Sequence, residues 1–418
     1  MADKSDGPLA RALRMLSRRV WFRATVFTAL AIVFALAAGV LGAVLPFRVT
    51  IELGQNSVGS LLQIIATAML TATTFSVTAM VSAYSAATTN ATPRATQLLI
   101  ADPTSQNALS TFVGSFTFAM VGIIALSTGY YTEQGRTILF FGTLVVIAVI
   151  VVTLLRWIAH LADFGRMPDV VDRVEEAATA ALVAHAASPA LGASVASGPH
   201  EHWSPVWAER SGYVSHVDMD ALQQAAEGAA VTLLVVTQAG RLTDRSRPLA
   251  RVSGDIDDET RRAIVAAFRV GARRSFEQDP RFGVIALAEI GSRALSPSTN
   301  DPGTAIEVIA ALQRVFERAL TTAPDRSVAH PSLAVVPPTL EELLVDAFRP
   351  IARDGAGFVE VHVRLQKSLA ALAACAPERA RQIETVARAL AKRADEHLDE
   401  ADRAELAREG RGAWAGVA

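Results

Sequence analysis

The chain is 418 residues long, which is enough for two or three domains. Its 39 Lys and Arg residues nearly balance its 41 Asp and Glu residues, and this formal net charge of -2 gives no reason to expect a nucleic-acid partner. The single cysteine, Cys375, excludes an internal disulfide framework and a metal site built from cysteines.

Nearly all long uncharged runs fall before residue 156, and they predict four transmembrane helices. A helix needs ~20 apolar residues to cross ~30 Å of hydrocarbon, and each run supplies them. Helices are expected because lipid offers no partners for unpaired backbone groups. The predicted spans run roughly from Trp21 to Leu45, from Val58 to Ser85, from Leu109 to Tyr130 and from Thr137 to Leu155.

Small residues lie close to one face of the first span, namely Ala31, Ala35, Gly39 and Gly42. Such faces let neighbouring helix backbones approach closely. We expect this face to pack within the bundle rather than to form a dimer seam.

Cationic residues at the N-terminus predict the orientation of the spans. Lys and Arg in short flanks favour the cytoplasmic side, and the N-terminal cluster is the largest in the spanning region. An even number of spans then returns the chain to the cytoplasm, so both termini of this multi-pass membrane protein are expected there. The cluster consists of Lys4, Arg11, Arg14, Arg18, Arg19 and Arg23.

The second span carries a stripe of hydroxyl residues at intervals of three and four, which places them along one helical face. This hydroxyl stripe either packs against a neighbouring helix or lines a water-filled path around an oligomer axis. The cores of all four spans lack Asp, Glu, Lys, Arg and His, which argues against proton-coupled transport. The stripe comprises the candidate pore-lining residues Thr67, Thr71, Thr74, Thr78, Ser82 and Ser85, and continues to Thr89.

After the spans the chain becomes rich in Asp, Glu and Arg, and its pattern predicts a cytoplasmic α+β, mostly helical C-terminal region. The expected fold class is therefore a membrane α-helical protein with a four-helix transmembrane bundle and this region attached. The expected divisions are a cytoplasmic tail (1–20), a four-helix transmembrane domain (21–166), a helix and flexible linker (167–210), a small β-rich module (211–253) and a helical cytoplasmic domain (254–418).

Strand composition within the β-rich module predicts strands over 213–217, 231–237 and 248–252, with a helix over 218–227 between the first two. Helical patterns follow at 255–276, 280–295, 303–321, 339–352, 357–374 and 377–408. Cys375 stands in an Ala-rich run and is expected to be a small buried side chain.

Motifs that carry catalysis are missing from the sequence. There is no phosphate-binding Gly-Lys loop, no paired-histidine metal motif and no nucleophile elbow, so we expect no enzyme activity and no cofactor. His200, Glu201 and His202 fit no standard zinc spacing, which favours no metal site. His362 lies in an apolar helical pattern and is expected to be structural.

A polar segment gathers Arg293, Ser296, Asn300, Asp301 and Thr304 ahead of a predicted helix that begins near Pro302. One interpretation is a rigid helix–loop–helix corner in which Asp301 caps the helix and Arg293 pairs locally. The other is a ligand site, because a helix N-terminus presents backbone donors and a positive dipole to an anion. Asp301 itself would repel an anion.

Three stretches carry a resemblance to a known family: residues 91–94 (Ala-Thr-Pro-Arg), residues 211–214 (Ser-Gly-Tyr-Val) and residues 293–304. With these stretches in order after four spans, the chain resembles the bacterial membrane protein family called domain of unknown function 2254. The resemblance covers nearly the whole chain. It implies a location in a bacterial inner membrane and this multi-pass topology, but no established activity. The chain departs from the expected pattern at 239–241, where Ala-Gly-Arg replaces a Gly-Asp pair.

Two classes of function follow as expectations. The first is a membrane sensor or scaffold whose cytoplasmic domain binds an unknown partner or a small ligand. The alternative is a homo-oligomeric channel or transporter with a path lined by the Ser and Thr residues of the second span. Both imply contact with the lipid bilayer.

Overall fold

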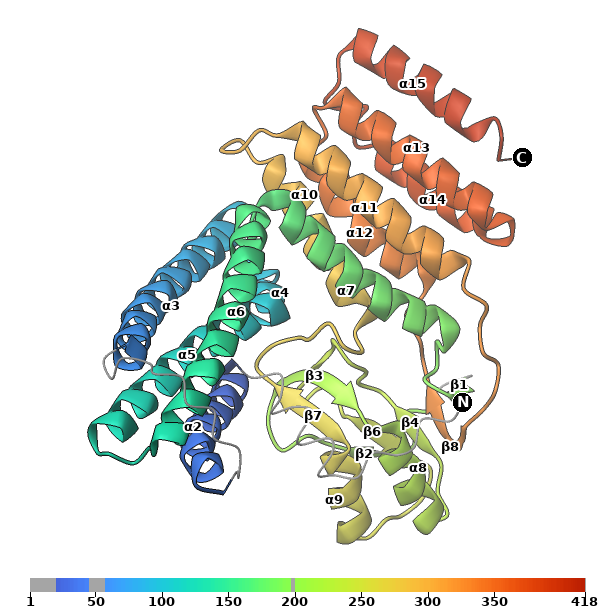
Figure 1. Cartoon of the computed structure of the whole chain (residues 1–418). Coiled ribbons are helices and arrows are strands. Elements are labelled where there is room, and N and C mark those ends of the chain that lie inside the picture. Colours follow the sequence, from blue (N-terminus) through green and yellow to red (C-terminus); the bar gives the residue numbers. More distant parts are fainter. Residues whose placement is uncertain (1–19, 45–56, 197–199, 418) are drawn as a thin grey trace. The chain divides into compact units, whose positions relative to one another are not determined.

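The computed structural model describes residues 20–44, 57–196 and 200–417. Most of the predicted cytoplasmic tail and its cationic cluster therefore lie outside the described residues. The chain, which Figure 1 colours from its N-terminus to its C-terminus, forms two compact units. The first unit ends at Thr89 and resumes over Thr96–Asp169, and the second comprises Asn90–Ala95 together with the chain from Val170 onward. The short segment after the second predicted span thus belongs to the second unit.

Four helices in the described part of the chain are long and apolar enough to cross a membrane, as the sequence predicts. They contain 25, 34, 25 and 31 residues, and at ~1.5 Å per residue each exceeds the ~30 Å of a hydrocarbon core. The helices are α2 (Val20–Val44), α3 (Ser57–Asn90), α5 (Pro103–Ser127) and α6 (Glu133–Asp163), with the short α4 (Thr96–Ile100) before α5.

Local capping chemistry determines where α5 and α6 begin. The Asp102 carboxylate accepts the backbone N–H of Ser105, and Pro103 occupies the first turn of α5. The same carboxylate lies 3.0 Å from Nε2 of His160, near the end of α6. The Thr132 hydroxyl caps α6 by accepting the backbone N–H of Gly135.

The small-residue face of α2 lies inside the first unit, where α2 packs against α5 and α6. Ala35 is fully buried, and its carbonyl accepts a 2.8 Å hydrogen bond from the Tyr131 hydroxyl. The Tyr130 ring covers Gly39 so closely that any Cβ there would overlap it. The expectation of packing within the bundle is confirmed for Ala35 and Gly39.

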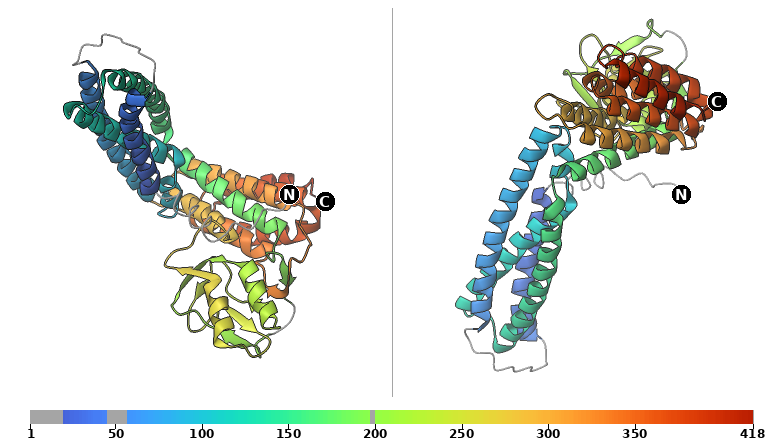
Figure 2. Two further views of the ribbon diagram at one scale, coloured as in Figure 1. Left: turned by 60° about the horizontal axis from the view of Figure 1, so that its bottom comes forward. Right: turned by 90° about the horizontal axis from the view of Figure 1, so that it is seen from above.

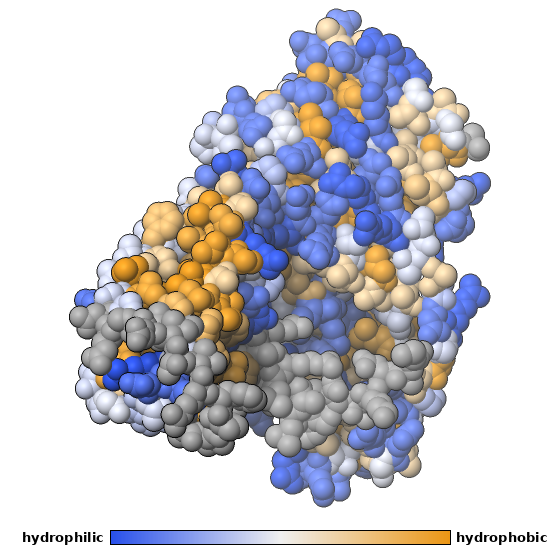
Figure 3. Space-filling view, viewed as in Figure 1, coloured by the Kyte–Doolittle hydropathy of each residue, from blue (hydrophilic) through white to orange (hydrophobic). Residues whose placement is uncertain are grey.

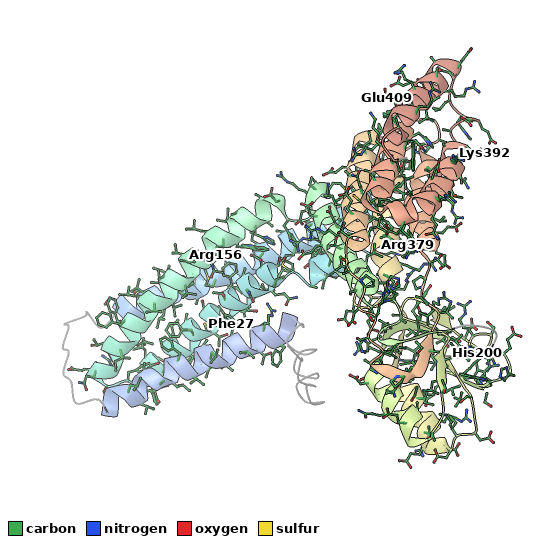
Figure 4. All side chains as sticks on the ribbon, turned by 90° about the vertical axis from the view of Figure 1, so that its right-hand side faces the viewer. Phe27, Arg156, His200, Arg379, Lys392 and Glu409 are labelled. Atoms are coloured by element: carbon green, nitrogen blue, oxygen red, sulfur yellow. The ribbon has the colours of Figure 1, made fainter. Side chains whose placement is uncertain are left out.

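The outer surface of the first unit is apolar. Large side chains such as Val33, Ile64, Phe75 and Leu155 are exposed on α2, α3 and α6. Figure 3 shows the hydrophobic residues gathered over these helices, and Figure 4 places Phe27 on α2 and Arg156 on α6 among the side chains they carry. Monomeric soluble proteins rarely expose contiguous apolar surface of this extent. The four helices fit a membrane protein.

The second unit contains two sheets that share one core. In the first sheet β1, β8 and β4 run parallel, while β6 and β2 continue it antiparallel. The second sheet is antiparallel, in the order β5, β3, β7. The strands are β1 (Ala193–Val195), β2 (Ser204–Val206), β3 (Gly212–Val217), β4 (Leu233–Val235), β5 (Leu242–Thr243), β6 (Ala250–Val252), β7 (Phe268–Gly271) and β8 (His330–Val335), with helices α8 (Met219–Gly228) and α9 (Asp258–Ala266).

The remaining helices of the second unit form a packed helical layer (Figure 2). Helix α10 contacts α11 and α12, and α13 contacts α11, α14 and α15. Helix α7 packs closely on α10, since Ala178 lies directly against Gly283. The helices are α7 (Met167–Ala187), α10 (Pro280–Ala294), α11 (Pro302–Leu320), α12 (Leu340–Asp354), α13 (Val359–Cys375), α14 (Ala380–Ala391) and α15 (Glu400–Trp414), with a 3-10 turn η1 (Pro377–Arg379).

The sheets extend beyond residues 211–253, the segment that the sequence predicts as a small β-rich module. Strands β1 and β2 lie in the stretch expected to be a flexible linker, and β7 and β8 lie in the stretch expected to be helical. A unit of about 45 residues buries too little apolar surface to be stable alone. Strands from both flanks complete its core.

Two helical predictions and one burial prediction differ from the structure. The helix expected over 255–276 ends at Ala266, because Phe268–Gly271 pairs with β3 as an antiparallel strand. The helix expected over 377–408 is broken between α14 and α15, where Ala394 and Leu398 turn inward to pack with Leu406. Cys375 is the last residue of α13 and is exposed, so the prediction of a buried cysteine was wrong.

Candidate functional site

The hydroxyl stripe of the second span lies on the outer surface of α3. All seven of its residues are exposed. The buried residues of this helix include Leu62, Ile65, Met69 and Met80. A helix turns about 100° per residue, so the stripe faces almost directly away from these buried side chains. The stripe therefore does not pack inside its own bundle.

The threonines of the stripe bond back to their own helix. Thr67, Thr71, Thr74 and Thr78 each donate the hydroxyl hydrogen to the carbonyl four residues earlier, at 3.0 or 3.1 Å. Each hydroxyl donor is therefore satisfied within its own helix, so placing the hydroxyl in an apolar environment costs little free energy. The hydroxyl oxygens keep free lone pairs, so the outward face presents acceptors.

Apolar side chains border the stripe on both sides. Leu70, Val77 and Val81 lie along one border, Ile64 and Phe75 lie along the other, and all five are exposed. These five residues thus flank the stripe, whereas the buried residues of α3 lie opposite it. Exposed apolar borders of this kind suit contact with lipid or with another helix.

The segment just after α3 is bound to α10. The Thr92 hydroxyl donates to Oε2 of Glu289 at 2.9 Å, and Nη1 of Arg94 lies 2.6 Å from the same oxygen. Thr92 is only 2% exposed. We call Thr92, Arg94 and Glu289 the latch. All three residues belong to the second unit, so the stretch from 91 to 94 that carries part of the family resemblance has a defined structural role.

The polar segment at 293–304 forms a tight turn between α10 and α11. The Asp301 carboxylate accepts the backbone N–H of Thr304 at 3.0 Å and its hydroxyl at 2.6 Å. These two hydrogen bonds, the side-chain one first, lower the pKa of Asp301. Asn300 adopts a left-handed conformation with φ of 50°, and its N–H donates to the Ser296 carbonyl at 2.8 Å.

The candidate residues of this turn do not converge on one point. The Ser296 hydroxyl turns to Ser298 and Thr299 within the loop. Arg293 is exposed at the end of α10 and forms no ion pair within the described residues. The geometry supports a capped corner in which Asp301 holds the start of α11 and Arg293 stays outside it.

Histidines and acidic residues form no group of three or more suited to a metal in the described ranges. His200 stacks on the ring of Trp203 with centroids 4.5 Å apart, and Figure 4 shows it on the sheet-containing part of the second unit. The contact observed for the His200 ring is therefore aromatic packing.

The latch was missed from the sequence because Glu289 is 195 residues from Arg94. The residues 91–94 were noted only for their family resemblance. A lone carboxylate in an apolar helix, such as Glu289 in α10, is the one local signal that pointed to a partner.

Comparison with known proteins finds short matches to uncharacterised proteins of Mycobacterium bovis and Mycobacterium tuberculosis. Each is 33% identical over 117 residues, which cover 27% of this chain and 22% of the relative. The chain therefore matches less than a quarter of the length of these relatives. No solved structure matches the chain.

A model of the predicted membrane protein family DUF2254 matches residues 17–371. The resemblance read from the three sequence stretches is confirmed, and the chain belongs to the DUF2254 family of predicted membrane proteins.

Proposed function

We propose that this protein is a homo-oligomeric membrane conduit in which α3 of each copy turns its hydroxyl stripe toward a shared axis. The observation that carries the proposal is the exposure of all seven hydroxyl residues on the face opposite the buried face of α3. A stripe that packed within the chain would be covered, as the small-residue face of α2 is at Ala35. Uncharged polar rings around an axis are one way to line a pathway through a membrane.

The hydrogen bonding of the stripe supports a preference for cations. The threonine hydrogens are directed to backbone carbonyls, which leaves oxygen lone pairs on the exposed face. Helix α3 contains no charged residue, so oxygen dipoles would set the field along the path. Small hydrated cations or neutral polar solutes are the permeants that such a surface favours, and the proposal involves no covalent chemistry.

The apolar borders of the stripe support assembly. In an oligomer, Leu70 and Val77 of one copy can pack against the opposite border of the next copy, near Phe75. Such packing would bury the borders and leave the hydroxyls facing the axis. Individual interhelical hydrogen bonds in membranes contribute only ~0.6 kcal/mol on average, so the borders would supply most of the association energy.

Ion flux from liposomes tests this function. The purified protein should carry a monovalent cation into liposomes faster than empty liposomes take it up. Thr74→Leu adds volume and removes a hydroxyl from the middle of the stripe, so flux should fall at least roughly tenfold. Thr74→Ser keeps the hydroxyl and should retain flux, and Met69→Leu on the buried face is the matched control. Equal flux through Thr74→Leu and wild type would contradict a path along this face.

A membrane sensor is the second candidate, and the latch favours it. The segment that continues α3 belongs to the second unit, where Glu289 of α10 binds both Thr92 and Arg94. If a partner or ligand moved α10, Glu289 would pull on Thr92 and Arg94, which follow α3 in the chain. The sensor and the conduit are compatible if such a movement opens or closes the path.

A further inference from the structure

A cleft of about 440 Å³ lies in the second unit between the sheets and the helical layer. Its walls come from the loop joining β4 to β5, from the loop joining β5 to β6, from the segment before α10, from the first turns of α10 and from Pro338, two residues before α12. Four arginines line it: Arg241, Arg247, Arg274 and Arg281. A ligand site of small-molecule size typically measures ~300–1,000 Å³.

Two of the four guanidinium groups are bound to carboxylates. Nε of Arg274 lies 2.7 Å from Oδ2 of Asp279, and Nε of Arg281 lies 2.6 Å from Oδ2 of Asp346. Glu342 lies 4.0 Å from the Arg281 guanidinium. The Asp279 carboxylate is 1% exposed and also accepts the backbone N–H groups of the first turn of α10. The acidic side chains are thus already engaged.

The other two guanidinium groups are not matched in this way. Neither Arg241 nor Arg247 forms an ion pair in the part of the chain that the structure describes. The nearby Asp244 carboxylate accepts the backbone N–H of Arg247 at 3.1 Å and attracts its charge without a direct contact to the guanidinium. Arg241 is half-buried. Burial first, and then the like charges of Arg247 and Arg281, lower the pKa of its guanidinium, and Glu342 offsets this only in part. An anion bound in the cleft would reduce the electrostatic repulsion between these cationic groups.

The backbone holds Arg241 in place. Gly240 has φ of +87°, and a Cβ at this position would overlap the Asp279 carboxylate. The N–H of Gly240 donates to the Val214 carbonyl at 2.8 Å, and the Arg241 carbonyl accepts the Val214 N–H at 3.0 Å. The backbone at Arg241 is therefore held by the sheet and by the close packing of Gly240 on Asp279, which helps to preorganise a ligand site.

We propose that this cleft binds a soluble small molecule that bears phosphate groups. A guanidinium offers a planar pair of donors that matches two phosphate oxygens, and it is more easily desolvated than an ammonium group. Arg241 and Arg247 are the recognition residues, while Arg274 and Arg281 add positive charge behind them. The cleft is larger than a single phosphate needs, so at least two phosphate groups or a phosphate with an organic body would fill it. The site does not depend on whether α3 conducts.

Binding to the purified full-length protein in detergent tests the proposal. Inorganic pyrophosphate and adenosine triphosphate are titrated by calorimetry at constant ionic strength, with citrate as a carboxylate of comparable charge. We expect at least one of the two phosphate compounds to bind more tightly than citrate. Each charge-assisted contact is worth about tenfold in affinity, so combining Arg241→Gln with Arg247→Gln should raise Kd roughly a hundredfold. Arg261→Gln, an exposed arginine on α9, should leave Kd unchanged.

Further variants keep the test independent of folding. Arg247 is exposed, so Arg247→Gln alone should fold normally and still raise Kd. Arg241→Lys keeps the charge but loses the planar donor pair, and its affinity should fall between wild type and Arg241→Gln. Unchanged affinity in a folded double variant, or no binding of either phosphate compound, would overturn the site. Direct binding of phosphatidylglycerol nanodiscs without any binding of the soluble phosphates would instead assign the arginines to a lipid headgroup and contradict a soluble ligand.

Discussion

His362 is a fully buried histidine in the helical layer of the second unit. It lies on α13, is 0% exposed, and neither ring nitrogen has a hydrogen-bond partner among the described residues. Burial lowers its pKa to about 4, against a weaker opposing influence of the Ala352 carbonyl and of Asp395. The residue is therefore neutral at physiological pH, and its position within the helical layer agrees with the structural role that its apolar surroundings predict.

This histidine should make stability depend on pH. In the unfolded chain a histidine titrates near pH 6.5, so the unfolded state takes up the proton first as the pH falls. The contribution of neutral His362 is complete above about pH 6.5 and is lost as the pH falls from there to about 4. At about pH 5 the loss is about 2 kcal/mol.

Thermal unfolding of the full-length protein at about pH 7.5 and pH 5 measures this effect. In His362→Leu the decrease in Tm between the two pH values should be smaller than in wild type by roughly 5 °C. His202→Gln, which alters an exposed histidine, should behave as wild type does. An identical pH dependence in His362→Leu and wild type would show that this group does not titrate as its burial implies.

At the scale of elements, the latch makes a prediction about local stability. Arg94 and Glu289 are partly exposed, so their ion pair alone contributes little. Thr92 is buried, and losing its hydrogen bond should cost about 1 kcal/mol. In Glu289→Ala, backbone amides at residues 90–95 should therefore exchange hydrogen for deuterium several-fold faster than in wild type. Glu307→Ala, which changes an exposed residue of α11, is the control. Equal protection of these amides in the wild type and in both variants would show that the latch does not stabilise residues 90–95.

Helices and caps were predictable where their signals are local. The four long helices follow from uncharged runs, and the start of α11 follows from Asp301 and Pro302, which act within one turn. Strand β7 was read as helix because Phe268–Gly271 gains its partner only from β3, more than 50 residues earlier. Local patterns contain no information about such pairing.

The candidate sites show the same limit. Periodicity located the hydroxyl stripe on one face of α3, but it could not indicate that the face is exposed, because exposure depends on where the other helices pack. The arginine cleft draws its residues from separate segments between 238 and 338. No spacing in the sequence links these segments. The departure from the family pattern at Gly240 and Arg241 falls in the cleft, but the sequence alone does not show which residues surround it.

At the scale of the whole molecule, the predicted topology has both termini in the cytoplasm. Alkaline phosphatase, which is active only in the periplasm, should be active when fused in the loop at Gly129 between α5 and α6. The same enzyme should be inactive when inserted at Asp325 in an exposed loop of the second unit, or when fused at Ala418. Both of these sites follow the last of the four candidate spans, so the two fusions should agree. An active fusion at Ala418 would contradict the predicted orientation.

In the proposed conduit, the exposed face of α3 meets water inside the membrane, whereas the other exposed faces of the same bundle are expected to meet lipid. Val145 and Val149 on α6 are exposed in the chain as well, but they belong to an apolar surface and should face hydrocarbon. These two positions therefore provide matched controls for the hydroxyl stripe, because exposure in the isolated chain is common to both sets.

Reaction of single cysteines with a membrane-impermeant thiol reagent distinguishes the two environments most directly. Cys375 is exposed and must first be replaced by serine. In that background, cysteines at Thr71 and Thr74 should react in intact membranes, while cysteines at Val145 and Val149 should stay unmodified. Protection of all four positions, with denatured protein reacting fully, would place the stripe in lipid or in a dry helix contact and contradict the conduit.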